Sequence, residues 1–239
     1  MPADPLAWLV NLEGVPSAYA AARDGIDVLL RDRGLRRTSP DLTAESLLRG
    51  AHASAVLEGS ASSLDEVRDG SGDAVAQAAL RVSTELLSLV PVVNRSPLQA
   101  LARIHALAGA GSVDDDQLGR PRGEEAAERV QGVAQALVAR SEVPALLTAA
   151  MVHAELLTAA PFASHNGIVA RATERLVLAA RGVDEKPLVV PEAGHLANRA
   201  AYESNLQGYA EGGRAGVHAW ALYAAEAFAA GAEASPLKS

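Results

Sequence analysis

The chain of 239 residues contains no cysteine, and aromatic residues make up only 3% of it. Without cysteine it can form no disulfide framework, no thiolate nucleophile and no cysteine-type zinc site. Hydrophobic residues nevertheless make up 49% of the chain, which is ample for a substantial core in a protein of this length. Because aromatic side chains are so scarce, we expect Ala, Leu and Val to fill that core.

Positive charge is also scarce, since the formal net charge is −8 and the isoelectric point lies near 5.3. Binding to a phosphate backbone needs clustered positive charge, so we expect no nucleic acid partner. No run of about 18 apolar residues occurs, because His153 and Glu155 interrupt the most apolar stretch. Met1–Asn11 lacks the basic start and apolar core of a signal peptide. We therefore expect a cytoplasmic protein without a membrane partner.

The histidines show no pattern typical of a metal site. They are His52, His105, His153, His165, His195 and His218. No pair has His-x-x-x-His spacing and no cluster of acids lies nearby, so we predict no metal site. His153 and Glu155 are two residues apart and point to different faces of a helix, which favours structural or surface roles over a catalytic pair. Asp114–Asp116 lacks the alternating spacing of calcium ligands, and we expect a solvated loop there.

The spacing of apolar residues predicts an all-α protein. Helices are expected over residues 18–33, 43–58, 73–90, 97–108, 123–140, 142–159, 169–180, 195–209 and 217–230. No internal repeat or strand pattern occurs. We expect a single domain, 1–239, with an irregular arm at 1–17 anchored by Trp8, N-terminal helices at 18–59, a core at 73–230 and a frayed tail at 231–239.

The most informative stretch is the loop at residues 160–168, which joins two of these helices. Pro161 and Gly167 bracket this loop, and Pro161 and Phe162 are expected to have structural roles. Backbone N–H groups of a glycine-containing loop at a helix start attract anions, phosphate above all. We therefore predict that Asn166 and Gly167 bind a phosphate group, and that Arg171, one turn further, adds a full positive charge.

The stretch resembles the signature loop of the Fic family, whose members transfer AMP from ATP to protein hydroxyl groups. The family motif reads His-Pro-Phe-x-Asp/Glu-Gly-Asn-Gly-Arg-x-x-Arg. This chain keeps Pro161, Phe162, Asn166, Gly167 and Arg171. It departs from the motif at Ala160 in place of the His, Ser164 in place of the acid, His165 in place of the first Gly and Ile168 in place of the first Arg.

Each departure removes a group that the resemblance assigns to catalysis. In the family the His accepts the proton of the target hydroxyl, the acid holds Mg²⁺ and the first Arg binds phosphate. An alanine methyl group accepts no proton, a neutral serine is a poor ligand for a hard divalent cation, and isoleucine carries no charge. We therefore expect that AMP transfer, which in the family uses ATP and Mg²⁺, is impaired and that binding of a nucleotide or phosphate is retained. We assign no residue a catalytic role.

Two alternatives stay open, because function resides in the site rather than in the fold. The chain could be an active nucleotidyl- or phosphoryl-transferring enzyme that uses His165 as a substitute base. It could also be an interaction module with an empty groove and a protein partner.

A second landmark supports the resemblance. Ser54, Glu58 and Gly59 fit the pattern Ser/Thr-x-x-x-Glu-Gly/Asn of the inhibitory helix that many Fic proteins carry before the loop. Tyr202, Leu206, Tyr209 and Trp220 resemble the closing helices of the family. In the family the inhibitory Glu meets the second Arg of the motif and denies it to the γ-phosphate. The resemblance thus predicts that Glu58 pairs with Arg171, with Ser54 close by.

The resemblance also concerns the docking of substrates. Gly109–Arg122 lies where the family has a β-hairpin flap that clamps the target peptide, but helical spacing resumes at Gly123. Little sequence remains for a flap. We therefore expect a Fic-like helical bundle around a central helix, anion loop and helix, with the flap hairpin reduced or absent, and so without an edge strand for a peptide.

Overall fold

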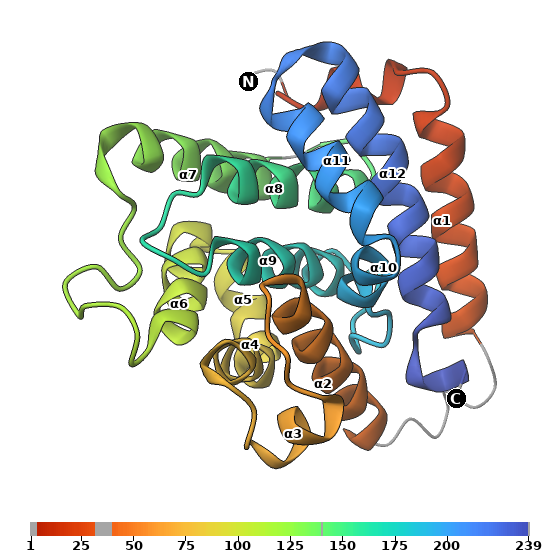
Figure 1. The fold of residues 1–239 in the computed structure, drawn as a ribbon. Coiled ribbons are helices and arrows are strands. Elements are labelled where there is room, and N and C mark those ends of the chain that lie inside the picture. Colours follow the sequence, from red (N-terminus) through yellow and green to blue (C-terminus); the bar gives the residue numbers. More distant parts are fainter. Residues whose placement is uncertain (1–3, 32–39, 140, 239) are drawn as a thin grey trace.

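Helices form the regular secondary structure of the computed structural model, which describes residues 4–31, 40–139 and 141–238. No β-strand occurs within these residues, so the predicted all-α class is confirmed (Figure 1). The α-helices are α1 (Val15–Leu30), α2 (Pro40–Leu57), α3 (Leu64–Asp69), α4 (Ala74–Glu85), α5 (Val90–Val93), α6 (Pro97–Gly109), α7 (Gly123–Val138), α8 (Ala145–Ala159), α9 (Asn166–Ala180), α10 (Pro191–Ala197), α11 (Arg199–Ala210) and α12 (Gly213–Glu233). Short 3₁₀ helices are η1 (Ala7–Asn11), η3 (Leu86–Leu89) and η4 (Pro236–Lys238).

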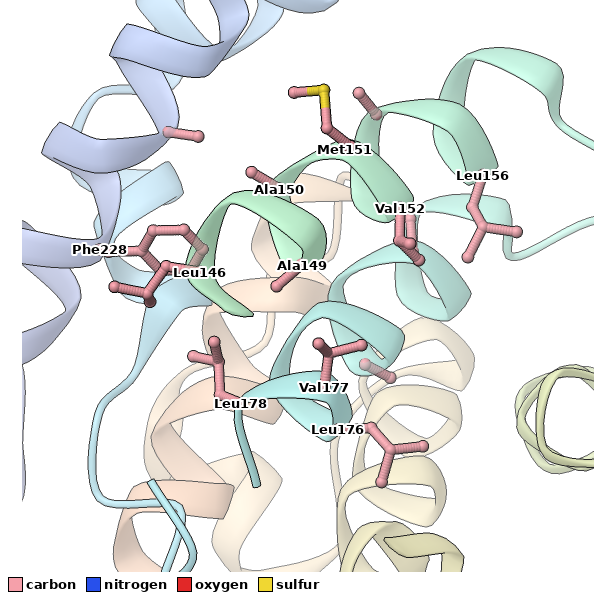
Figure 2. Packing of buried hydrophobic residues seen from close by; sticks show 14 of the residues in the cluster. Leu146, Ala149, Ala150, Met151, Val152, Leu156, Leu176, Val177, Leu178 and Phe228 are labelled. Atoms are coloured by element: carbon pink, nitrogen blue, oxygen red, sulfur yellow. The ribbon is translucent and has the colours of Figure 1, made fainter. Parts of the chain in front are cut away.

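The paired helices α8 and α9 form the centre of the structure, with α7, α11 and α12 around α8 and with α2, α4 and α6 beside α9 (Figure 1). Apolar residues cover α8 on nearly all sides, which suits a helix enclosed by others. In Figure 2, Ala149 and Val152 of α8 face Val177 of α9, and Leu146 projects toward Phe228 of α12. This packing fixes both helices that border the loop at residues 160–165.

A buried arginine positions α2 against the centre. Arg175 of α9 is 2% exposed and donates to the Ser46 hydroxyl of α2 at 2.6 Å and to its carbonyl oxygen at 3.2 Å. Its Nη1 also lies 3.2 Å from a Glu192 carboxylate oxygen on α10. A Cβ atom at Gly50 of α2 would lie 2.2 Å from the same Nη1, so only glycine permits this approach. The middle of α2 is thereby held beside α9.

Both chain ends differ from the prediction. Trp8 is 38% exposed and contacts the Arg214 guanidinium of α12, 5.4 Å from its ring centroid, so it anchors the N-terminal segment only in part; Leu9 of η1 and the following Leu12 are buried. The prediction of a frayed tail is also wrong for residues 231–238, where Ala232, Ser235 and Pro236 are buried. The tail packs because α12 continues to Glu233 and lies against α10 and α1. Residues 1–3 and 239 lie outside the described residues.

One helical segment is long and apolar enough to span a membrane. Ala74–Val93 has a mean hydropathy of 1.2, a value that core helices of other proteins also reach. The segment is divided into α4, η3 and α5, and Pro91 lies in the first turn of α5. Arg81 within it donates to the carbonyl oxygens of Leu107 and Ala108. These features fit a segment that packs one face against the bundle rather than an unbroken spanning helix.

Candidate functional site

The end of α2 places Glu58 at a fixed position. Gly59 has φ 91°, a left-handed conformation that favours glycine. Its N–H donates to the Val56 carbonyl oxygen, and the Ser60 N–H donates to that of Ala55, both at 3.0 Å. These two bonds form a Schellman motif, which ends the helix and satisfies its last carbonyl groups. Glu58 therefore follows directly on Leu57, the last residue of α2, and Gly59 ends the helix as predicted.

The loop between α8 and α9 is braced by side chains from within and from outside. Asn166 accepts from the Phe162 N–H at 2.9 Å and donates to the Phe162 carbonyl oxygen at 3.0 Å. Phe162 is buried and stacks on His105, with ring centroids 4.4 Å apart. Arg122 donates from its backbone to the Pro161 carbonyl oxygen at 2.8 Å and from its guanidinium to that of Ala160 at 2.7 Å. The Asn166 side chain thus supports the loop, and only its backbone N–H remains for an anion.

Two loop residues adopt the left-handed conformation without being glycine. Ala160 has φ 42° and His165 has φ 56°. Such a conformation typically costs non-glycine residues about 1 to 3 kcal/mol, and it persists where the surroundings enforce it. The Ser164 hydroxyl and His165 Nδ1 lie 2.5 Å apart, which engages both polar groups. Burial lowers the pKa of His165, so its ring is neutral at pH 7.

Arg171 is the charged centre of the site and is only 1% exposed. Its Nη2 lies 2.7 Å from Glu58 Oε1, so the predicted ion pair is present. Ser54 accepts from Nε through its hydroxyl at 2.9 Å and from Nη2 through its carbonyl oxygen at 3.1 Å. Nη1 donates to the Tyr202 hydroxyl at 3.0 Å. Burial disfavours the charge, but Tyr202 and Glu58 outweigh it and raise the pKa of Arg171.

The carboxylate of Glu58 lies directly on the first turn of α9. A Cβ atom at Gly167 would stand 1.9 Å from Glu58 Oε1 and 3.0 Å from Arg171 Nη2. Glycine is therefore required for this close approach. The first N–H groups of a helix carry partial positive charge and favour anions. Glu58 thus supplies a negative group at the place where Gly167 and Arg171 were predicted to receive phosphate.

Two of the positions that differ from the family motif, Ile168 and Ala160, lie in different surroundings. Ile168 is 2% exposed and packs into the core, so its side chain does not face the loop. Ala160 instead borders an open cavity of about 540 Å³. The cavity is lined by Arg122, Glu125, Ala126, Arg129, Thr158, Ala159 and Ala160. Arg129 is already paired there with Glu155 at 2.7 Å.

A buried cluster in the core was missed by sequence reasoning. Glu174 of α9 contacts His153 Nδ1 through Oε1 at 3.1 Å and His195 Nε2 through Oε2 at 3.0 Å. His153 is completely buried and so has no surface role, whereas Glu155 faces Arg129 and Tyr209 on another side of α8. Among the described residues, these three form the one group of potential metal ligands. The signal in the sequence was a histidine inside an otherwise apolar helix.

Solved structures with the same arrangement identify the fold. A Fic family protein from Desulfovibrio desulfuricans G20 matches with a TM-score of 0.75 at 18% identity, covering 93% of this chain and 74% of that one. A fragment of Fic-1 from C. elegans matches with a TM-score of 0.71 at 17% identity, covering 92% and 71%. A variant of that fragment gives a TM-score of 0.72, covering 96% and 73%. No protein-family model and no curated protein matches the sequence. The chain therefore has a Fic-like fold, as the motif predicted.

Proposed function

We propose that this protein of Fic-like fold binds a nucleotide or phosphate at the start of α9, that Glu58 closes this site, and that the site does not carry out ordinary AMP transfer. One observation carries the proposal. The carboxylate of Glu58 touches the first turn of α9 at Gly167 and lies 2.7 Å from Arg171 Nη2. A carboxylate and a phosphate oxygen bind such donors in the same way, so they compete for the site.

The position of Glu58 favours a closing role over a purely structural one. Its side chain is 29% exposed whereas that of Arg171 is 1% exposed, so the pair lies at the edge of the buried region. A ligand arriving from solvent can therefore replace the carboxylate without opening the core. Arg171 keeps its bonds to Ser54 and Tyr202 when this happens.

The absence of a base argues against ordinary AMP transfer. General-base catalysis is typically worth about 100- to 10,000-fold, and Ala160 offers no atom for it. Ser164 stands where the motif has its acid, and its hydroxyl is engaged by His165. Mg²⁺ prefers charged or carbonyl oxygen ligands in octahedral geometry, so the residues of this loop do not fit it. Binding without a resident metal ion is thus the function that the site supports best.

A second candidate function rests on His165. Its ring is neutral at pH 7 because burial lowers its pKa, and a neutral imidazole can accept a proton. In this alternative His165 is the substitute base of a nucleotidyl- or phosphoryl-transferring enzyme. In either case we propose that the protein acts in the cytoplasm and uses a free nucleotide. We also propose that binding of any protein partner depends on whether the nucleotide is bound.

Isothermal titration with ATP, ADP, AMP and inorganic phosphate, with and without Mg²⁺, tests the proposal on wild-type and Glu58→Gln proteins. Glutamine keeps the size of the side chain but removes its charge, so we expect ADP affinity to rise by about tenfold or more, equivalent to about 1.4 kcal/mol. Glu45→Gln is the matched control, because Glu45 lies on the helix that precedes Glu58, is 28% exposed and pairs with Arg49. It should leave affinity unchanged.

The site is localised by adding Arg171→Lys to Glu58→Gln, with folding checked by circular dichroism. Lysine keeps the charge but not the planar set of donors, so affinity should fall back toward that of the wild type. If Glu58→Gln binds none of the four ligands, the proposal is wrong and an interaction module with an empty groove becomes the better explanation.

A further inference from the structure

A buried chain of polar side chains, here called the polar chain, runs from the proposed anion site into the core. Its members come from helices α8 to α12 and none is more than 6% exposed. They are Arg171, Tyr202, His153, Glu174, His195 and Tyr223. Burying polar and charged groups is costly unless they satisfy one another, so this arrangement requires an explanation beyond packing.

The contacts form one sequence, and four of the five are hydrogen bonds. The fifth, between His153 Nδ1 and Glu174 Oε1, is close but is not aligned as a hydrogen bond. Tyr202 lies 3.0 Å from Arg171 Nη1 and 2.9 Å from His153 Nε2. His153 Nδ1 lies 3.1 Å from Glu174 Oε1. The second oxygen of Glu174 lies 3.0 Å from His195 Nε2, and His195 Nδ1 lies 3.0 Å from the Tyr223 hydroxyl. Five helices thus meet through one set of polar contacts.

The donors in the first half of the polar chain can be assigned. Arg171 has only donors, so the Tyr202 oxygen accepts from it and the Tyr202 hydroxyl hydrogen is free to donate to His153 Nε2. The remaining hydrogen of a neutral His153 ring is then on Nδ1, facing Glu174. Burial lowers the pKa of His153 to about 4, in agreement with a neutral ring at pH 7.

Glu174 supplies the negative charge of the polar chain. Burial alone would raise its pKa, but the contacts with His153 and His195 outweigh burial and hold the pKa of Glu174 at about 2. A fully buried carboxylate is stable only where charge and donors compensate it. Arg171, which is always charged, joins Glu174 through Tyr202 and His153. Arg171 thus pairs directly with the partly exposed Glu58, and it is linked to the buried Glu174 only through Tyr202 and His153.

A resident metal ion is not needed to explain the cluster of His153, Glu174 and His195. Each histidine contacts a different oxygen of Glu174, and the other nitrogen of each ring meets a tyrosine hydroxyl. Apart from the contact between His153 and Glu174, which is close but not aligned as a hydrogen bond, neighbouring groups of the polar chain are hydrogen-bonded, and such groups orient one another.

We propose that Tyr202, supported by His153 and Glu174, is a positioning residue that keeps the Arg171 guanidinium aimed at the start of α9 when Glu58 has been displaced. This inference rests on the proposed function, because the ligand would bind an arginine that is already in place. Tyr202 belongs to α11, whereas Ser54 belongs to α2 and Glu58 directly follows it, so the support from Tyr202 survives a movement of α2. Preorganised groups bind more tightly because less order must be created on binding.

The experiment adds Tyr202→Phe to the Glu58→Gln protein, which removes one hydroxyl and keeps the ring. We expect the affinity for ADP to fall by about tenfold, the usual scale for a bond to a charged donor. Tyr209→Phe in the same background is the matched control. Tyr209 also lies on α11, but its hydroxyl donates to Glu155, outside the polar chain, at 3.2 Å. It should leave the affinity unchanged, and equal losses in both variants would overturn the inference.

A second measurement separates this inference from the proposed function. Hydrogen exchange at Arg171 Nη1, the nitrogen that donates to Tyr202, followed by NMR without any ligand, reports how firmly the guanidinium is held. Exchange should stay slow in Glu58→Gln and become about tenfold faster when Tyr202→Phe is added. Unchanged exchange would refute the positioning role even if ADP binds, whereas the expected change without any ADP binding would refute only the proposed function. A stoichiometric metal ion found by elemental analysis would overturn the hydrogen-bonded assignment of His153, Glu174 and His195.

Discussion

Replacing Glu58 by alanine should lower the free energy of unfolding, and the burial of its ion pair with Arg171 determines by how much. Removing one partner of a fully buried pair typically costs about 3 to 5 kcal/mol, whereas an exposed pair contributes about 0 to 1 kcal/mol. Here Arg171 is 1% exposed and the Glu58 side chain is 29% exposed, so the pair lies between these limits. Arg171 also keeps its bonds to Ser54 and Tyr202. We therefore expect a loss of about 2 kcal/mol in the free energy of unfolding.

Two smaller effects of the substitution oppose each other. A carboxylate at the C-terminal end of α2 is unfavourable to that helix, and its removal recovers a few tenths of a kcal/mol. The same carboxylate is favourable at the first turn of α9, and that contribution is lost. The estimate of about 2 kcal/mol thus stands, and it corresponds to a fall in melting temperature of about 4 to 8 °C for a protein of this size.

Thermal unfolding followed by circular dichroism at pH 7 measures this change. The control is Glu45→Ala, since Glu45 is 28% exposed and pairs with Arg49 and Arg68, which are 28% and 44% exposed. Its loss should be no more than about 1 kcal/mol. An equal shift for Glu45→Ala and Glu58→Ala, or an unchanged melting temperature for Glu58→Ala, would show that burial of Arg171 does not make its pair important for stability.

Three further predictions concern catalysis, pH and the start of α9. Incubation with labelled ATP and lysate should leave proteins unlabelled, in the wild type and in Glu58→Gly; labelling that His165→Ala abolishes would instead establish His165 as a base. Burial lowers the pKa of His105 and of His153 from 6.5 to about 4, so the unfolded chain binds more protons between these values. Stability should therefore fall as the pH falls from 6.5 to 4, by up to about 1.4 kcal/mol per pH unit for each histidine. His105→Gln should flatten this dependence in melting curves, and an equal slope would contradict the assignment. Gly167→Ala should lower the melting temperature, because its Cβ would stand 1.9 Å from Glu58 Oε1; in Glu58→Ala the same substitution should be nearly neutral, and an equal loss in both proteins would mean that this contact is not the cause.

Several features follow from the sequence because they depend on residues close together in the chain. Helical periodicity was sufficient for the all-α class, since packing selects one face of each helix. Gly59 ends α2 because glycine, unlike other residue types, adopts φ 91° without strain. The residue types at Ala160, Ser164 and Ile168 are likewise read directly from the sequence, because they do not depend on packing.

Other features depend on the packing of distant segments. The motif predicted that Arg171 meets Glu58, but the bonds of Arg171 to Ser54, 117 positions away, and to Tyr202, 31 positions away, could be placed only by the fold. Asn166 was expected to bind phosphate, yet its side chain turned out to brace Phe162.

The cluster of His153, Glu174 and His195 and the burial of the C-terminal tail also depend on the packing of distant segments. His153, Glu174 and His195 lie on three helices, and nothing in their spacing brings them together. The tail near Ser235 looked frayed because it is short and lacks a helical pattern, but the end of α12 packs it against the bundle. Local patterns record contacts within one or two helical turns, whereas these contacts arise only when helices from separate parts of the chain pack against one another.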